Sequence, residues 1–162
     1  MRPAVTVALV AVVSAAAGAG LYTWLTPHDR TAEAAAPSAV VDALPSQVNG
    51  IPLTGLDGQA VTLGNWSGQW RLVNFWASWC PPCIKEIPLL IDAQRRWQDR
   101  NLQILGPAMD SQDRASELTE RLQIDYPVFF GNEEIAAAAT QLGDTLGALP
   151  YSALIDPEGV VR

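Results

Sequence analysis

The chain begins with a long apolar stretch, residues 4–25, that contains no charged side chain. As a helix, this stretch would be about 33 Å long at about 1.5 Å per residue, which matches the roughly 30 Å hydrocarbon core of a bilayer. Tyr22 and Trp24 lie near its end, and aromatic side chains of this kind favour the membrane interface. The pattern predicts an N-terminal transmembrane helix over residues 1–25.

A cleaved signal peptide is the alternative for the same stretch. The apolar core of a signal peptide is ordinarily about 7–15 residues long, which is shorter than this run. Ala-x-Ala patterns, at which such peptides are cleaved, lie beyond the run at 32–34 and 34–36, and Pro37 follows the second. Arg2 on the short side weakly favours a cytoplasmic N-terminus. We favour an uncleaved anchor that leaves the rest of the chain exported.

Residues 26–45 have the composition of a linker. They hold three prolines and an Ala-rich middle, and they show no periodic apolar pattern. Such a segment is expected to behave as a flexible chain. The single histidine of the protein, His28, falls here and is interpreted as a solvated linker residue. The predicted folded domain, residues 46–162, therefore contains no histidine.

Within residues 46–162, strand patterns alternate with helix patterns. Short β-prone segments at 51–53 and 59–63 flank the turn dipeptide Asp57-Gly58. Residues 70–77 are nearly all apolar, which is typical of a strand buried on both faces. The other predicted elements are helices from Cys80 or Pro81 to about Arg100, from Ser111 or Asp113 to Leu122, and over 133–142 with Asn132 as cap, and strands over 102–108, 126–130, 151–155 and from Val160. This alternation predicts an α/β fold with parallel pairing, to which the final β-turn-β segment adds antiparallel strands.

The composition excludes several function classes. The formal net charge is −7, and an acidic chain is poorly suited to nucleic acid, whose phosphates are neutralised by basic patches. The 49% hydrophobic content excludes a wholly disordered acidic chain. Two cysteines are too few for a disulfide scaffold or an all-cysteine zinc site. With no histidine in the domain, we predict no metal site.

The two cysteines, Cys80 and Cys83, follow the buried strand and open the next predicted helix. At this spacing they can approach within disulfide distance, and a helix N-terminus stabilises the thiolate of the first one. Cys80 is therefore predicted to attack and Cys83 to resolve. Pro81 and Pro82 remove two backbone donors, so we expect the amides of Cys83 and Ile84 to stabilise the anion.

Two other interpretations of the cysteine pair are weaker. A zinc half-site needs two further ligands, and the domain has no other cysteine and no histidine. A purely structural disulfide across so short a loop would stabilise the fold little. We favour a redox-active Cys80–Cys83 disulfide, with no separate cofactor.

Residues 73–83, followed by Glu86 and Pro88, resemble the thioredoxin-like thiol-disulfide oxidoreductases of the TlpA/ResA/CcmG type. The resemblance covers residues 51–162. It implies a thioredoxin fold, a central mixed sheet flanked by helices, with a central insertion at about 113–140. It also implies a bacterial inner-membrane anchor and a catalytic domain in the periplasm or extracytoplasmic space. Members usually reduce protein disulfides, several of them in cytochrome c maturation, and are recharged by a membrane electron donor of the CcdA or DsbD kind.

The resemblance also assigns roles to single residues. Pro150 matches the family's cis-proline, which packs opposite the cysteine pair and guides the substrate backbone together with Leu149 before it. Glu86 matches the family's active-site glutamate, which could exchange a proton with Cys83; a solvent-facing helix glutamate is the alternative. Asn74 stands where cytoplasmic thioredoxins carry a buried aspartate, and an amide cannot act as a base.

Further residues near the cysteines are expected at the substrate surface or in the core. Trp79 is predicted to form a partly exposed lid over the disulfide, and to contact substrate together with Pro81, Pro82 and Leu149. Trp76 is predicted to be a core residue. Lys85 is expected to be a solvated helix residue, although it could assist the thiolate.

The chain departs from the family pattern at its end. Members usually continue beyond the strand at Val160 into one more helix, whereas this sequence stops at Arg162, so we expect that helix to be missing or the chain to be truncated. We therefore expect part of the sheet to be exposed. Two other functions stay open: a disulfide-forming oxidase and a non-catalytic thioredoxin-like binding module.

Overall fold

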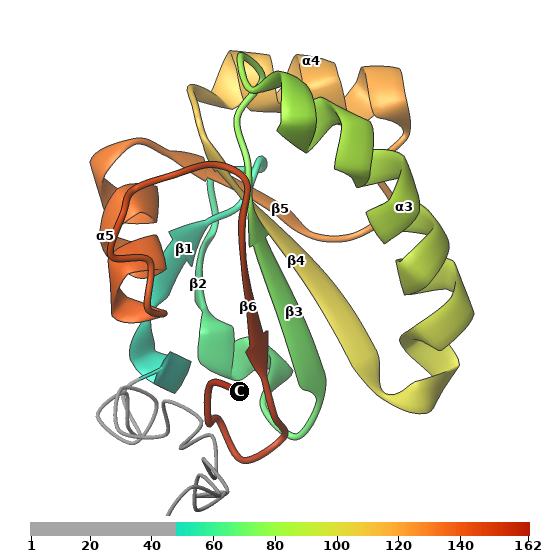
Figure 1. The fold of residues 1–162 in the computed structure, drawn as a ribbon, viewed down its shortest axis with the longest axis vertical. Helices are drawn as coiled ribbons and strands as arrows, with labels where there is room; N and C mark the ends of the chain where they lie inside the picture. The colour runs from blue at the N-terminus through green and yellow to red at the C-terminus, as the bar shows by residue number, and fades with distance from the viewer. Residues whose placement is uncertain (1–47) are drawn as a thin grey trace, which may run out of the picture. The chain divides into compact units, whose positions relative to one another are not determined.

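The structure is a computed structural model, and it describes residues 48–162 (Figure 1). The predicted transmembrane helix over 1–25 and the linker over 26–45 lie outside the described residues. Within 48–162, no helix is both long and apolar enough to cross a membrane.

The described chain alternates strands with helices, as the apolar pattern predicts. Its elements are β1 (Pro52–Thr54), β2 (Ala60–Thr62), β3 (Trp70–Phe75), α3 (Pro81–Trp97), β4 (Leu102–Met109), α4 (Gln112–Leu122), β5 (Val128–Gly131), α5 (Glu133–Gln141) and β6 (Tyr151–Ile155), with short 3₁₀ turns at Val48–Gly50, Leu63–Trp66 and Gln98–Arg100. The segment expected as a central insertion forms α4, β5 and α5. After β6 the described residues form a turn and one antiparallel bridge, between Ile155 and Val161.

The central sheet has the strand order β5-β4-β3-β6. β3 pairs parallel with β4 and antiparallel with β6, and β4 pairs parallel with β5. β1 and β2 form a separate antiparallel hairpin, which a bridge from Gly55 to Phe129 connects to the edge strand β5. The predicted mixed sheet of an α/β fold is therefore confirmed.

The two faces of the sheet bury different sets of side chains because successive residues of a strand point to opposite sides. Val73 and Phe75 of β3 belong to a core shared with α5 and the hairpin. Trp76 and Ala108 belong to a second core shared with α3 and α4. Figure 1 shows this division, with α3 and α4 on one side and α5, β1 and β2 on the other.

Part of the face that α3 covers is open at the edge strand β6. Ser152 is exposed and Leu154 is 36% exposed. These residues pair with Asn74 and Leu72 of β3, on the α3 side of the sheet. The expected exposed part of the sheet is found here.

The predicted cap at Asn132 is wrong in its chemistry. Asn132 does precede α5, but its φ of −106° and ψ of −73° lie in the right-handed helical region, and its side chain makes no capping hydrogen bond. A capping side chain ordinarily requires an extended backbone at this position. Ser111 likewise precedes α4 without a side-chain cap, and its own N–H donates to Asp110 Oδ1 over 3.1 Å.

Arg71 is a fully buried arginine that ties β3 to the segments around it. Its guanidinium donates to Asn49 Oδ1 at 2.7 Å, to the Leu63 carbonyl at 3.0 Å and to the Asp156 carbonyl at 3.1 Å. Burial lowers the pKa of this guanidinium, and the nearby Asp156 charge opposes that shift. The three acceptors come from different parts of the chain, so Arg71 holds both ends of the domain against β3.

We expect Arg71→Met to lower the free energy of unfolding by about 3 kcal/mol, because it leaves two buried carbonyls without their donor. Urea denaturation would measure the loss. Arg95→Ala is the control, since Arg95 pairs with Asp125 at 2.6 Å on the exposed surface. An exposed ion pair of this kind contributes less than about 1 kcal/mol to the free energy of unfolding. Equal losses in the two variants would contradict a structural role for Arg71.

Candidate active site

Cys80 and Cys83 form a disulfide at the point where the chain leaves β3 and enters α3. Their Cα atoms lie 5.3 Å apart, within the range that a disulfide spans. Cys80 is the N-cap residue of α3, with an extended backbone, and Pro81 and Pro82 occupy the first helical positions. Proline suits those positions because their N–H groups have no acceptor within the helix. The predicted pairing and its place at the helix start are confirmed.

The two sulfurs differ in access and in hydrogen bonding. Cys80 is 4% exposed and Cys83 is fully buried. The Cys83 N–H donates to Cys80 Sγ at 3.3 Å, as expected. The expectation for the second amide is wrong: the Ile84 N–H donates to the Cys80 carbonyl at 3.2 Å, because it closes the first turn of α3. One backbone amide and the helix N-terminus therefore face the Cys80 sulfur.

Asp110 holds the loop that carries Cys80, and sequence reasoning missed it. Its Oδ2 accepts from the Ser78 N–H at 2.9 Å and from the Ser78 hydroxyl at 2.6 Å. Asp110 is 4% exposed and follows β4, the neighbour of β3 in the sheet. A sequence signal for Asp110 does exist, because it is an acidic residue at the carboxyl end of β4, which runs parallel to the strand before the cysteines. The carboxyl ends of parallel strands lie at the same edge of a sheet.

Pro150 follows a cis peptide bond, Leu149–Pro150, as the resemblance implies. It directly precedes β6, whose Tyr151 pairs with Phe75 at the end of β3. Pro150 therefore lies at the same end of the sheet as the loop that carries the cysteines. Leu149 is partly buried and packs against both cores.

The other predicted substrate-contact residues lie at the surface beside the disulfide in sequence. Trp79 is 60% exposed, and Pro81 and Pro82 are exposed as well. Trp76 is fully buried, which confirms its prediction as a core residue. Lys85 is exposed, as expected for a solvated helix residue.

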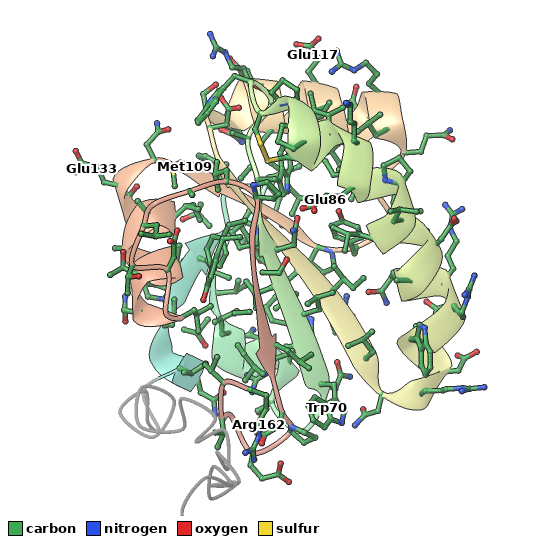
Figure 2. The ribbon with its side chains drawn as sticks, viewed as in Figure 1. Trp70, Glu86, Met109, Glu117, Glu133 and Arg162 are labelled. Carbon is green, nitrogen blue, oxygen red and sulfur yellow. A yellow bond between two sulfur atoms is a disulfide. The ribbon has the colours of Figure 1, made fainter. Side chains whose placement is uncertain are left out.

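Glu86 faces the sheet, so the alternative of a solvent-facing glutamate is wrong. Asn74 Nδ2 donates to Glu86 Oε1 at 2.6 Å and to Ser152 Oγ at 3.0 Å. Figure 2 shows Glu86 between α3 and the strands. Glu86 is half-buried and lies three residues after Cys83 on the same helix, so the two side chains share one face. The Glu86 carboxylate therefore lies on the face of α3 that also carries Cys83.

Tyr126 is a second residue near Glu86 that sequence reasoning did not single out. Burial raises the pKa of its hydroxyl, and the charges of Glu86 and then Asp125 raise it further. The hydroxyl is therefore protonated at any physiological pH. This hydroxyl is buried and has no hydrogen-bond partner within residues 48–162.

No metal centre is visible in the described part of the chain. Residues 48–162 contain no group of three or more His, Cys, Asp or Glu side chains that could hold an ion. The chemistry that these residues offer is that of a dithiol, a carboxylate and hydrogen-bond donors.

Comparison with protein families and curated proteins gives one consistent result. The model of the AhpC/TSA family matches residues 44–162. The thiol-disulfide oxidoreductase ResA of Bacillus cereus (strain ZK / E33L) is 28% identical over 111 residues, which cover 67% of this chain and 61% of ResA. ResA of Bacillus thuringiensis subsp. konkukian is 30% identical over 114 residues, with coverages of 67% and 61%. The chain thus spans about three fifths of the length of these relatives.

Solved structures agree. A thiol:disulfide interchange protein of the thioredoxin family from Chlorobium tepidum superposes with a TM-score of 0.60 at 28% identity, over 68% of this chain and 78% of that one. The structure of MTB dsbF superposes with a TM-score of 0.62 over 73% and 84% of the two chains. At 22% identity, dsbF supports the fold alone. The thioredoxin-like fold is confirmed.

We expect Asp110→Asn to destabilise the cysteine loop. An asparagine places an amide N–H opposite the donors of Ser78 or Ser111, and a buried donor without an acceptor costs about 1–3 kcal/mol. Thermal unfolding should show the loss, and hydrogen exchange at the Ser78 amide should accelerate. Asp113→Asn is the control, because Asp113 is exposed in the first turn of α4. Unchanged exchange at Ser78 would contradict the role of Asp110.

Proposed function

Since the chain belongs to the AhpC/TSA family, we propose that it is a thiol-disulfide oxidoreductase of the TlpA/ResA/CcmG type that reduces protein disulfides. The observation that carries the proposal is the asymmetric cysteine pair at the start of α3. Cys80 keeps 4% of its surface exposed and its sulfur receives a backbone N–H, whereas Cys83 is fully buried. An attacking sulfur needs access and anion stabilisation, and a resolving sulfur needs proximity to the first.

The reaction begins with the reduced dithiol. The Cys80 thiolate attacks one sulfur of a substrate disulfide, a Cys80–substrate bond forms, and the second substrate sulfur leaves as a thiolate that takes a proton from water. Cys83 then loses its proton and attacks Cys80 Sγ. The Cys80–Cys83 disulfide forms, the remaining substrate sulfur leaves, and two electrons have passed to the substrate.

Glu86 is the proposed acceptor of the Cys83 proton. Asn74, on β3 beside Glu86, carries an amide and cannot take up a proton at neutral pH. It instead donates to Glu86 Oε1 and orients the carboxylate. Positioned carboxylates contribute about 10²–10⁴-fold to proton-transfer steps.

The family resemblance and the apolar residues 4–25 support our proposals for the direction of electron transfer, the redox partners and the cellular location of the protein. We propose a reductase anchored in the bacterial inner membrane, with its domain in the periplasm or extracytoplasmic space and a donor of the CcdA or DsbD kind. Cytochrome c maturation is the proposed pathway, because several members of the family act there. A disulfide-forming oxidase and a non-catalytic binding module are the competing functions.

Trapping of a mixed disulfide tests the mechanism. Cys83→Ala should accumulate a covalent adduct between Cys80 and a substrate, because the resolving sulfur is gone, and mass spectrometry after non-reducing electrophoresis would identify it. The double variant with Cys80→Ser is the control and should trap nothing. A binding module is favoured if Cys83→Ala forms no adduct and Cys80→Ser binds the same partners as the wild type.

Equilibration against glutathione tests the direction. A reductase should show a reduction potential below about −200 mV, whereas a strong oxidase lies near about −120 mV. The wild type should also reduce insulin, and Cys80→Ser should lose this activity. A potential near that of a strong oxidase would overturn the proposed direction and leave the thiol-disulfide chemistry in place.

A further inference from the structure

Three buried polar atoms beneath α3 have no hydrogen-bond partner within the described part of the chain. They are Asn74 Oδ1, Trp76 Nε1 and the Tyr126 hydroxyl. Asn74 and Trp76 are fully buried, and Tyr126 is 4% exposed. Buried polar atoms are nearly always hydrogen-bonded in folded proteins, to protein or to ordered water. Three buried polar atoms without a hydrogen-bond partner in one region therefore require an explanation.

The strand register and one glycine bring these residues together. Val73 pairs with Leu105 and Trp76 bridges to Ala108, so Asn74 lies beside Gly106 of β4. A Cβ atom built on Gly106 would lie 2.9 Å from Tyr126 Cε2 and 3.0 Å from Trp76 Nε1. A side chain at Gly106 would therefore clash with the phenol ring and the indole N–H, which both approach the Gly106 backbone closely.

The orientation of the Asn74 amide places its oxygen on the same side. Its Nδ2 donates to Ser152 on β6 and to Glu86 on α3. β6 and β4 flank β3 on opposite edges. The oxygen is bonded to the same carbon and points away from Nδ2, so it faces β4 and Gly106.

The donors and acceptors of the three residues are complementary to one small molecule. An indole N–H can only donate, an amide oxygen can only accept, and a phenol hydroxyl can do either. We propose that an internal water molecule binds between Asn74 Oδ1, Trp76 Nε1 and the Tyr126 hydroxyl, and that Tyr126 is a positioning residue which holds Asn74, and through it Glu86, for proton uptake from Cys83. Internal waters typically make about three hydrogen bonds, the number that this site offers.

Other charged groups around Glu86 do not replace this arrangement. On α3, Lys85 is exposed and Arg95 pairs with Asp125 at 2.6 Å. β3 and β6 present the neutral Asn74 and Ser152, and Cys83 lies one turn earlier on the helix. Asp125 raises the pKa of Tyr126 less than Glu86 does. Glu86 is the carboxylate that responds to the water and the amide.

The water site and its kinetic role are tested separately. The kinetic role rests on the proposed function, whereas the water does not. A crystal structure of the oxidised wild-type protein at high resolution should show density within about 3.2 Å of all three atoms. An empty site would overturn the inference, whatever the activity of the protein.

Tyr126→Phe tests the kinetic role, with Tyr151→Phe as the matched control. The Tyr151 hydroxyl donates to the Leu142 carbonyl at 2.7 Å, so its removal should lower the thermal midpoint without changing the pH profile. Removal of the Tyr126 hydroxyl, whose one partner is the proposed water, breaks no hydrogen bond between protein groups of residues 48–162, so the two variants are compared by their pH profiles.

The readout is the rate at which Cys83 resolves a preformed mixed disulfide on Cys80, followed by tryptophan fluorescence from pH 4 to pH 8. Without the water, Asn74 is held less firmly in place, and its hydrogen bond to the carboxylate of Glu86 becomes weaker. In Tyr126→Phe the fall in rate at low pH should therefore move to higher pH by roughly half a unit or more. A profile identical to that of the wild type, or an equal shift in Tyr151→Phe, would overturn the role of Tyr126. A wild type that resolves no mixed disulfide would instead refute the proposed function.

Discussion

The structure depends on the burial of β3. This strand is paired on both edges, packed on both faces, and anchored at its start by the buried guanidinium of Arg71. Because its position is fixed in this way, the loop that follows it leaves the sheet at a defined point. Cys80 therefore precedes α3 as its N-cap residue, where the helix N-terminus and one backbone amide face its sulfur. A reactive sulfur on a less constrained segment would lack this stabilisation.

Two carboxylates support the cysteine pair from different directions, and their surroundings differ. Asp110 accepts three hydrogen bonds, from the Ser78 N–H and hydroxyl and from the Ser111 N–H. Its lone pairs are engaged by the loop, which suits a structural anion. Glu86 accepts from Asn74 at one of its two carboxylate oxygens and is half-buried. Their hydrogen bonds thus distinguish a residue that holds the loop from the one for which we propose a part in the reaction.

The sequence allowed prediction of those features that depend on local pattern. The strand before the cysteines, the helix after them and the alternation of elements follow from apolar periodicity and turn residues, which are properties of short segments. The cis bond at Pro150 and the inward position of Glu86 came from the family resemblance. Asp110 and Tyr126 were missed because their contacts join segments far apart in the chain, and no local pattern distinguishes such residues from ordinary surface or core positions. The Asn132 cap failed because its backbone is already helical.

One signal for the missed residues is present in β4, once the register is known. Gly106, Ala108 and Asp110 alternate along the chain, and therefore point to the same side of the sheet, the side that α3 covers. Glycine and alanine leave room for Tyr126 and Trp76, whereas the acidic residue lies at the end, beside the cysteine loop. Small residues at every second position of a central strand indicate that other groups approach its backbone closely. Within residues 48–162 those groups are a phenol and an indole whose polar atoms have no hydrogen-bond partner, which is why we propose that the face of β4 below the helix serves the active site as well as the core.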